Sequence, residues 1–329
     1  MRRTAVRTSL AAFAGLSLLL TGCGTAAGGA QPSAAGERIE VVASTNVYGD
    51  IVKAIGGEKV NVRAIITKTS QDPHSYEATA QDRLVISKAA LIVENGGGYD
   101  GFIHKMADDS NIPHSNIISA VDVSGLATED DHATVAAGGS ADSHSDGHDH
   151  NHGAFNEHVW YSMDAMAKVA DAVAARLATL DGAAAATFTA NSEAFKSGLR
   201  ELSGKLNGIK AGHDAAPVAV TEPVPVYLLE AAGLANKTPS EYSSAIEEGT
   251  DVPPAVLKAA TDLAGSAELG FLAYNEQTDG PQTEALKKAA ESAGVPVVNF
   301  SETLPDGKTY VQWMTDNVEN ISNALEKNR

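Results

Sequence analysis

Short apolar runs alternate with amphipathic stretches along most of the chain. Four runs in the first half are rich in β-branched residues and short enough to be buried strands, at 39–43, 60–66, 91–94 and 117–120. Two segments between them, 48–55 and 81–90, carry apolar residues at helical spacing. Alternating strands and helices predict a parallel sheet wrapped by helices, in which ligands bind beyond the carboxyl ends of the strands.

The second half of the chain repeats this alternation after one long polar segment with a narrow apolar stripe. The spacing of the stripe predicts a helix that spans 183–212, and its members are Phe188, Phe195, Leu199, Leu202, Leu206 and Ile209. Strands are expected at 217–220, 269–274 and 295–300, and an amphipathic helix closes the chain. About 290 residues of folded chain suffice for two lobes. The predicted fold class is therefore α/β with two lobes, each a mostly parallel sheet wrapped by helices.

The first 22 residues have the features of an export signal. Three arginines within the first seven residues precede an apolar stretch at 10–20 that is too short to remain as a membrane span. The next residues end at Cys23 in a pattern typical of a lipobox, which predicts cleavage before Cys23 and acylation of its thiol. Cys23 is the only cysteine in the chain, so it forms no internal disulfide. We expect an exported protein, tethered by flexible residues 23–37 and lipid-anchored to the outer face of the cytoplasmic membrane.

The chain is strongly acidic, with 42 aspartates and glutamates against 24 lysines and arginines and a formal net charge of −18. This balance argues against binding to nucleic acid and against resting on anionic lipid. The lipid anchor is therefore the only membrane contact that we expect.

Residues 128–153 lack any apolar period and contain five histidines among Asp, Ser, Gly and Ala. Such a segment cannot bury enough apolar surface to offset its ordering entropy, which predicts a disordered loop. Closely spaced imidazoles suit zinc, copper or nickel, and we expect auxiliary metal binding by His144, His148, His150 and His152. The alternative is a soluble linker whose histidines, including His132, have no role.

Two short motifs supply candidate ligands for an ordered metal site. The first, Asp72-Pro73-His74-Ser75-Tyr76-Glu77, follows a predicted strand and combines an imidazole with two carboxylates and a proline that fixes φ. The second, Asn156-Glu157-His158-Val159-Trp160, leads to Ser162, a residue type that caps helices. In addition, Glu222 stands at the carboxyl end of the strand at 217–220, on the side of the sheet where ligands are expected.

The two motifs, the histidine-rich insert between them and the lipobox together resemble the metal-binding lipoproteins of ABC importers, the cluster A-I solute-binding family. The resemblance covers the chain from Cys23 to its end. It implies an N-terminal lobe at 38–182, a rigid linking helix at 183–212 and a C-terminal lobe at 213–329, with the ion in the cleft between the lobes. It also implies a binding protein without enzymatic activity, which passes its metal to separate permease and ATPase subunits.

The resemblance also implies a ligand set. The family's first two ligands are histidines at positions that match His74 and His158. The third is commonly histidine in zinc-selective relatives and glutamate in manganese-selective ones, and this chain has Glu222. The fourth, usually aspartate, follows the last strand, where this chain has Glu302.

Four other acidic residues lie near these positions in the sequence. Glu276 and Asp279 follow another predicted strand and are the alternatives to Glu302 as the fourth ligand. We favour Glu302, because glutamate reaches one methylene further than the aspartate it replaces. Glu247 and Glu248 belong to a loop that also resembles the family's, and we expect both to be solvated.

The identity of the metal is open between two candidates. Four protein ligands close a tetrahedral zinc site, whereas two bidentate glutamates complete the six-coordinate shell that suits manganese. We favour zinc, with manganese or iron as the alternative, because the histidine-rich segment suits zinc and zinc binds nitrogen and oxygen sites more tightly than manganese.

Other functional classes are less consistent with the sequence. A zinc hydrolase is disfavoured because the chain lacks both a His-Glu-x-x-His and a Gly-x-Ser-x-Gly motif. A surface adhesin or passive metal buffer would need the lipid anchor and the histidine-rich loop but no ordered site. No oligomer signal appears in the sequence, and we expect a monomer.

Overall fold

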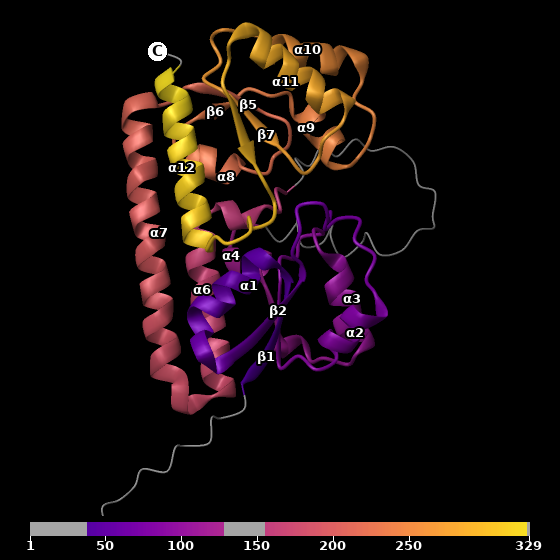
Figure 1. Cartoon of the computed structure of the whole chain (residues 1–329), viewed down its shortest axis with the longest axis vertical. Helices are drawn as coiled ribbons and strands as arrows, with labels where there is room; N and C mark the ends of the chain where they lie inside the picture. Colours follow the sequence, from indigo (N-terminus) through magenta and orange to yellow (C-terminus); the bar gives the residue numbers. More distant parts are fainter. Residues whose placement is uncertain (1–37, 128–154, 328–329) are drawn as a thin grey trace, which may run out of the picture. The chain divides into compact units, whose positions relative to one another are not determined.

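The computed structural model describes residues 38–127 and 155–327, which contain two parallel four-stranded sheets (Figure 1). The first sheet has the order β2-β1-β3-β4 and consists of β1 (Ile39–Thr45), β2 (Val60–Ile66), β3 (Leu91–Glu94) and β4 (Ile117–Ser119). The second has the matching order β6-β5-β7-β8 and consists of β5 (Pro217–Val220), β6 (Ala235–Asn236), β7 (Leu272–Asn275) and β8 (Val297–Phe300). In each sheet the strand that comes first in the chain, β1 or β5, lies between the second and the third. The strand order therefore changes direction beside β1 and β5, which gives each sheet a topological switch point, where sheets of this kind bind ligands.

We call the first sheet and its helices the first lobe. Its helical elements are α1 (Asn46–Gly56), η1 (Gly57–Lys59), α2 (Ala80–Ile86), α3 (Gly101–Asp109), η2 (His114–Asn116), α4 (Ala120–Ser124), η3 (Val159–Tyr161) and α6 (Met163–Leu180). A capping box between Thr79 and Asp82 starts α2. Ser162 caps α6 as predicted, because its hydroxyl oxygen accepts a hydrogen bond from the backbone N–H of Ala165 at 3.3 Å.

We call the second sheet and the helices around it the second lobe. Between the lobes the chain forms η4 (Gly182–Ala184) and the long helix α7 (Ala185–His213). The helices of the second lobe are α8 (Val226–Ala231), α9 (Ser240–Glu247), α10 (Pro254–Ala264), α11 (Pro281–Ala293) and α12 (Tyr310–Lys327). Proline in the first turn of α11 and Gly294 in the left-handed region just after it fix where that helix begins and ends.

One hydrophobic core runs through both lobes. Its members come from one face of each sheet, with Val41, Ala43, Leu91 and Val93 in the first and Val218, Val220, Ala273 and Phe300 in the second, and from α1, α6, α7 and α12. Two smaller cores cover the opposite faces, beneath α2 and α3 in the first lobe and beneath α9, α10 and α11 in the second. Because the main core is continuous, wide separation of the lobes would expose apolar surface to water.

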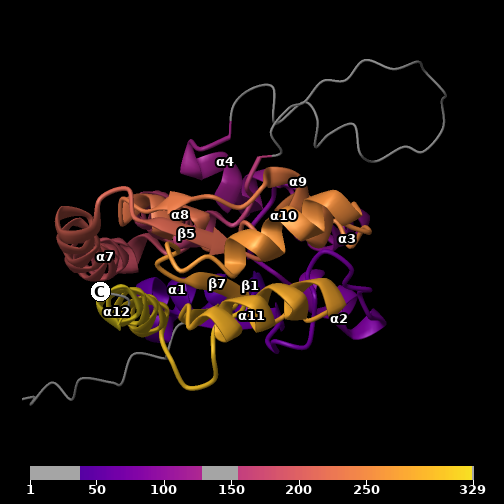
Figure 2. The same ribbon diagram turned by 90° about the horizontal axis from the view of Figure 1, so that it is seen from above.

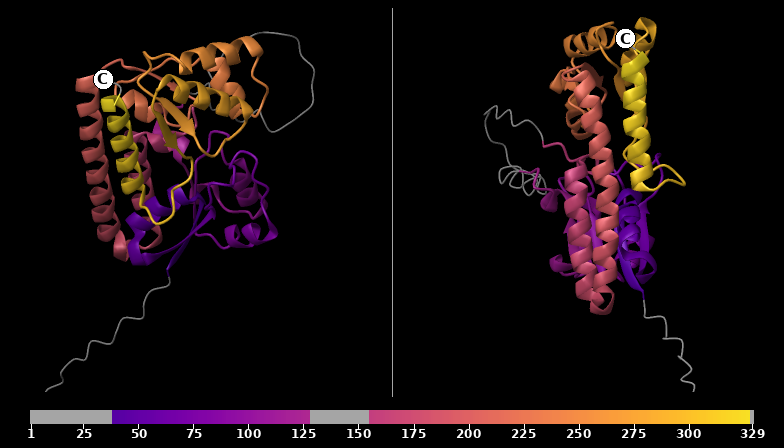
Figure 3. Two further views of the ribbon diagram at one scale, coloured as in Figure 1. Left: turned by 45° about the horizontal axis from the view of Figure 1, so that its top comes forward. Right: turned by 90° about the vertical axis from the view of Figure 1, so that its left-hand side faces the viewer.

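The long helix α7 contacts both lobes. It packs against α1 and α6 of the first lobe and against α8 and α12 of the second. In Figure 2 α7 and α12 lie together at one side of both sheets, and in both views of Figure 3 α12 runs beside α7. The predicted apolar stripe is buried along its whole length, from Phe188 at 0% exposure to Ile209 at 7%. The helix therefore holds the two lobes to one rigid element.

The structure confirms the α/β fold class and corrects the bounds of several predicted elements. The strands predicted at 269–274 and 295–300 begin later, at Leu272 and Val297. The helix predicted at 81–90 is too long, because α2 ends at Ile86. The backbone N–H of Ala90 donates to the carbonyl of Glu40 in β1 at 2.9 Å. This N–H is therefore paired with the sheet and not with a helical carbonyl, so the segment before β3 is not helical. Among the described residues, no helix is both long and apolar enough to cross a membrane.

Candidate metal centre

His74 lies in the loop that follows β2, and Asp72 shapes that loop. Oδ1 of Asp72 accepts a hydrogen bond from the backbone N–H of His74 at 2.9 Å, and Oδ2 accepts one from the Ser75 hydroxyl at 2.6 Å. In such a turn the aspartate side chain accepts a hydrogen bond from the backbone of the residue two positions later, which fixes the backbone there. The imidazole of His74 packs edge-on against the ring of Tyr99 at 4.9 Å, and its side chain is 30% exposed. His74 is thus held in a defined orientation while it stays accessible to solvent.

His158 stands at the start of η3, and its side chain is 2% exposed. Its Nδ1 lies 2.8 Å from Oδ1 of Asn156, whose amide nitrogen donates to the carbonyl of Pro223 in the second lobe at 3.0 Å. The second hydrogen bond fixes which end of the amide faces the ring, so Nδ1 carries the proton and donates it. The lone pair of His158 is therefore on Nε2, the arrangement that metal-binding histidines show.

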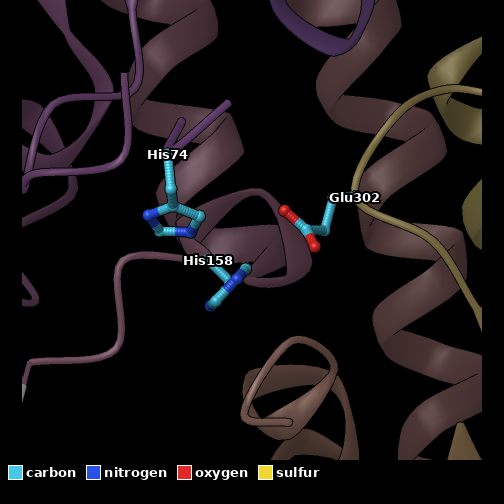
Figure 4. Close-up of side chains that lie close together, drawn as sticks. All are labelled: His74, His158 and Glu302. Atoms are coloured by element: carbon cyan, nitrogen blue, oxygen red, sulfur yellow. The ribbon is translucent and has the colours of Figure 1, made fainter. Parts of the chain in front are cut away.

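The second lobe contributes carboxylates at the carboxyl ends of its strands. Glu302, which follows β8, is 6% exposed and accepts hydrogen bonds from the Tyr99 hydroxyl at 3.1 Å and from Asn275 Nδ2 at 2.9 Å. His74, His158 and Glu302 each offer one ligand atom, and these three atoms lie within 4.8 Å of one another. Figure 4 shows the two imidazoles and the carboxylate around a common space.

Glu222 lies next to this group of three and is buried, with 4% exposure. Its Oε2 accepts a hydrogen bond at 2.5 Å from Asn275 Nδ2, the same atom that donates to Glu302. Glu222 is thus connected to Glu302 through one amide group, although it is not among the three residues whose ligand atoms lie closest together.

The structure separates Glu302 from its two alternatives. Glu276 is exposed. Asp279 is also exposed and accepts a hydrogen bond from the hydroxyl of Tyr274 at 2.5 Å. Of the three acids, only Glu302 points into the cluster with the histidines.

Two further glutamates lie beside the site, and sequence reasoning gave neither of them a role. Glu157 and Glu247 form a second group with His74, again with ligand atoms within 4.8 Å, and their side chains are 13% and 17% exposed. The prediction that Glu247 is solvated is wrong, whereas Glu248 is exposed as expected. Glu247 is the last residue of α9, and its Oε1 comes within 3.6 Å of Nδ1 of His158. No local signal distinguishes it from Glu248, since its burial depends on the other lobe.

The buried carboxylates repel one another and resist ionisation. Burial and the nearby charge of Glu302 raise the pKa of Glu222 to about 8. Burial is also the main reason that the pKa of Glu157 rises to about 7 and that of Glu247 to about 9. Burial lowers the pKa of both His74 and His158, which favours neutral imidazole, the form that binds metal. The site therefore combines neutral nitrogen donors with carboxylates whose repulsion a divalent cation would relieve.

Other predicted sites lie outside the described residues. They are Cys23, His132 and the four histidines of the predicted auxiliary loop, His144, His148, His150 and His152.

Comparison with known proteins bears directly on this geometry. The model of the ZnuA family, described as the zinc-uptake complex component A, periplasmic, matches residues 41–324. The chain belongs to this family. Members of the ZnuA family are substrate-binding proteins of metal ABC importers, which work with a permease and an ATPase and are not enzymes.

Individual relatives of this ZnuA-family protein are distant in sequence but similar along their whole length. The manganese ABC transporter substrate-binding lipoprotein scaA of Streptococcus gordonii is 24% identical over 331 residues, which cover 94% of this chain and 97% of that protein. The periplasmic zinc-binding protein TroA of Treponema pallidum is 20% identical with a TM-score of 0.67, over 88% and 99% of the two chains. The FpvC protein of Pseudomonas aeruginosa, solved with Mn²⁺, is 21% identical with a TM-score of 0.67, over 88% and 99%. The two solved structures support the two-lobe fold.

Proposed function

We propose that the protein captures a divalent transition metal between its two lobes, with His74, His158, Glu302 and Glu222 as ligands, and delivers it to the permease and ATPase of an importer. The observation that carries this proposal is the convergence of two imidazoles from the first lobe and one carboxylate from the second within 4.8 Å. The hydrogen bond between His158 and Asn156 supports it, because it leaves Nε2 free for the ion. Two neutral histidines with two glutamates balance the charge of a divalent cation.

We further propose zinc as the metal that binds most tightly. Imidazole nitrogen is a preferred zinc ligand, and zinc stands above manganese in the affinity order of divalent ions at nitrogen and oxygen sites. Manganese is the second candidate, and one observation favours it. Glu157 and Glu247 add two carboxylates beside His74, so the site is richer in oxygen than a four-ligand zinc site requires.

The protein would bind its metal on the outer side of the cytoplasmic membrane while it is anchored there by lipid. Acylation of Cys23 would tether the mature protein to the outer face of that membrane, and relatives whose names include the word lipoprotein support this localisation. We propose that the protein acts as a monomer and meets the membrane only through its lipid and its permease partner.

Competitive titration of the mature protein with zinc and manganese tests the function. We expect both ions to bind tightly at the same single site, with zinc displacing manganese. His74→Ala and Glu222→Gln should each strongly weaken binding at that site. A variant that lacks residues 128–153 should keep this tight site and lose only weaker sites. The matched controls are His213→Ala and Glu276→Gln, because His213 lies outside the His74–His158–Glu302 cluster and Glu276 is exposed.

Two outcomes would reject the proposal. If both site variants bind metal like their controls, the ligands are wrong. If deletion of residues 128–153 abolishes all metal binding, the protein is a buffer or adhesin with a histidine-rich loop and has no ordered capture site.

A further inference from the structure

A second group of metal-ligating side chains lies in the first lobe, and it shares no residue with the site described above. His104 and Asp108 are four residues apart on α3, so they lie on the same face of that helix one turn apart. His114 begins η2, just after α3. Each of the three offers a ligand atom, and these atoms lie within 4.8 Å of one another.

The two histidines are close and well oriented. Their ring centroids are 5.3 Å apart at an angle of 83°, and Nε2 of His114 lies 3.0 Å from Oδ1 of Asp108. On the far side of His104, its Nδ1 lies 2.9 Å from Oε1 of Glu94, at the carboxyl end of β3. The Glu94 carboxylate accepts the Nδ1 proton, and this hydrogen bond raises the pKa of His104 to about 9. A metal ion would therefore bind at Nε2 by displacing the proton that this atom carries.

The Glu94 side chain is more deeply buried than the carboxylate of an ordinary surface ion pair. Its side chain is 5% exposed, and its second oxygen, Oε2, is buried without a hydrogen-bond partner. A buried carboxylate behind a histidine is the arrangement that orients metal-binding imidazoles and makes them more basic. In contrast, exposed pairs such as His114 with Asp108, at 72% and 51% exposure, contribute little to stability. Stability alone therefore does not explain why the imidazoles of two histidine–carboxylate pairs lie 5.3 Å apart.

We propose that His104, Asp108 and His114 form a second metal site, oriented by Glu94, that binds zinc, nickel or copper at the surface of the first lobe. Two imidazoles and one carboxylate match the ligand preference of these ions and do not match that of calcium or magnesium. The ligand atoms are at most 4.8 Å apart, and the exposed side chains need only small rotations to approach the roughly 2 Å bonds of zinc.

The site differs from the main one in accessibility and in ligand number. Three protein ligands leave one tetrahedral position to water, and the side chains of His104 and His114 are 43% and 72% exposed. Metal should therefore enter and leave this site more easily than the site around the buried His158. The second site would collect metal at the surface, and it stands on observations independent of the function proposed above.

Residue-resolved chemical modification of histidines tests this inference in the full mature chain. The protein is treated with diethylpyrocarbonate at increasing concentrations of zinc chloride, and each modified histidine is measured by mass spectrometry. This readout separates His104 and His114 from His74 and from the histidines at 128–153. We expect zinc to protect His104 and His114 together, with one shared midpoint, and to leave His213 unprotected at that concentration.

Two variants of adjacent aspartates sharpen the test. Asp108→Asn keeps both histidines but removes the carboxylate ligand, and it should move the shared midpoint at least about tenfold to higher zinc. Asp109→Asn is the matched control, because Asp109 pairs with Arg83 outside the cluster and should leave the midpoint unchanged. Glu94→Gln should also raise the midpoint, by about 10- to 100-fold.

The inference is wrong if His104 and His114 are modified equally with and without zinc while His74 becomes protected. It is also wrong if the two histidines titrate with different midpoints, or if Asp108→Asn behaves like Asp109→Asn. Because protection of His74 is followed in the same samples, failure of this site is distinguishable from failure of the main one.

Discussion

Glu222 and Glu302 share one hydrogen-bond donor, the side-chain nitrogen of Asn275, at 2.5 and 2.9 Å. Asn275 is the last residue of β7, beside the switch point of the second sheet, and it is 2% exposed. Its amide bridges two carboxylates whose charges repel each other. Asn275 therefore positions the oxygen ligands of the second lobe, although sequence motifs gave it no role.

Replacement of Asn275 should weaken metal binding without removing any ligand. We expect Asn275→Ala to lower zinc affinity by about 10- to 100-fold, the usual effect of losing a residue that orients metal ligands. Chelator competition measures this loss. Asn299→Ala, at an exposed position in β8, is the matched control. Equal affinity of the two variants would show that Glu222 and Glu302 do not depend on the shared amide.

Asn156 should orient a nitrogen ligand, His158, as Asn275 orients the oxygen ligands. Asn156→Ala removes the acceptor for the Nδ1 proton of His158 and should lower zinc affinity by about 10- to 100-fold. Asn156→Asp keeps that acceptor and adds negative charge, so it should retain more affinity than the alanine variant despite losing the hydrogen bond to Pro223. If the two variants are equally weak, the link to Pro223 matters more than the orientation of the ring.

The stability of the metal-free protein should fall as pH rises from 7 to 9. Glu222 and Glu247 have pKa values raised to about 8 and about 9 from an ordinary 4.5, so the folded state holds their protons more tightly than the unfolded state does. Such a group stabilises the fold fully below its ordinary pKa, and this contribution is lost as pH rises through the folded-state value. Burial lowers the pKa of His158 below 6.5, so its effect on stability has the opposite sign: stability rises with pH as the imidazole loses its proton. This rise is complete by about pH 7 and does not affect the range from 7 to 9.

Thermal unfolding at several pH values measures this dependence. Glu222→Gln cannot ionise, so its unfolding temperature should fall less between pH 7 and 9 than that of the unmodified protein. Glu276→Gln changes an exposed glutamate and should follow the unmodified protein. A common slope for all three proteins would mean that Glu222 is already ionised in the metal-free fold.

Most of the fold could be predicted from the sequence because its signals are local. The buried strands are apolar runs, and the stripe from Phe188 to Ile209 has the spacing of one helix face, as the structure confirms. Predictions failed where tertiary contacts decide. Residues 87–90 have helical composition, but the hydrogen bond from Ala90 to Glu40 places them at the entrance to β3.

The candidate site shows the same limit. His74 and His158 stand in motifs that the sequence reveals, and Glu302 follows a strand end. Glu157 stands beside His158 in the second motif but was given no role there, and Glu247 stands in no such motif; their ligand atoms come within 4.8 Å of that of His74 only in the folded chain. The role of Asn275 is likewise invisible in the sequence, since its two partners stand 53 and 27 residues away.

Metal should stabilise the protein strongly while its lobes move little. Several hydrogen bonds already tie the lobes without metal, including Asn46 to Leu304 at 2.7 Å and Tyr161 to the carbonyl of Ser301 at 2.8 Å. Zinc at about 100 times its Kd should add about 2.7 kcal/mol to the free energy of unfolding. Small-angle scattering should nevertheless give nearly equal radii of gyration with and without zinc. A clear compaction on binding would contradict the rigid connection through α7 and the shared core.

Three glycines in α7 provide a test of how tightly this helix is packed. A Cβ atom at Gly204 or Gly208 would meet no atom within 4 Å, whereas at Gly198 it would lie 3.1 Å from a methyl carbon of Val311 in α12. Gly204→Ala and Gly208→Ala should each stabilise the protein by roughly 0.5–1 kcal/mol, because alanine loses less backbone entropy in a helix than glycine does. Gly198→Ala gains the same helix propensity but must push α12 away or displace Val311, so it should be less stable than either of the other variants. Chemical denaturation of the metal-free variants measures these differences, and a Gly198→Ala protein as stable as the other two would show that the contact between α7 and α12 is loose.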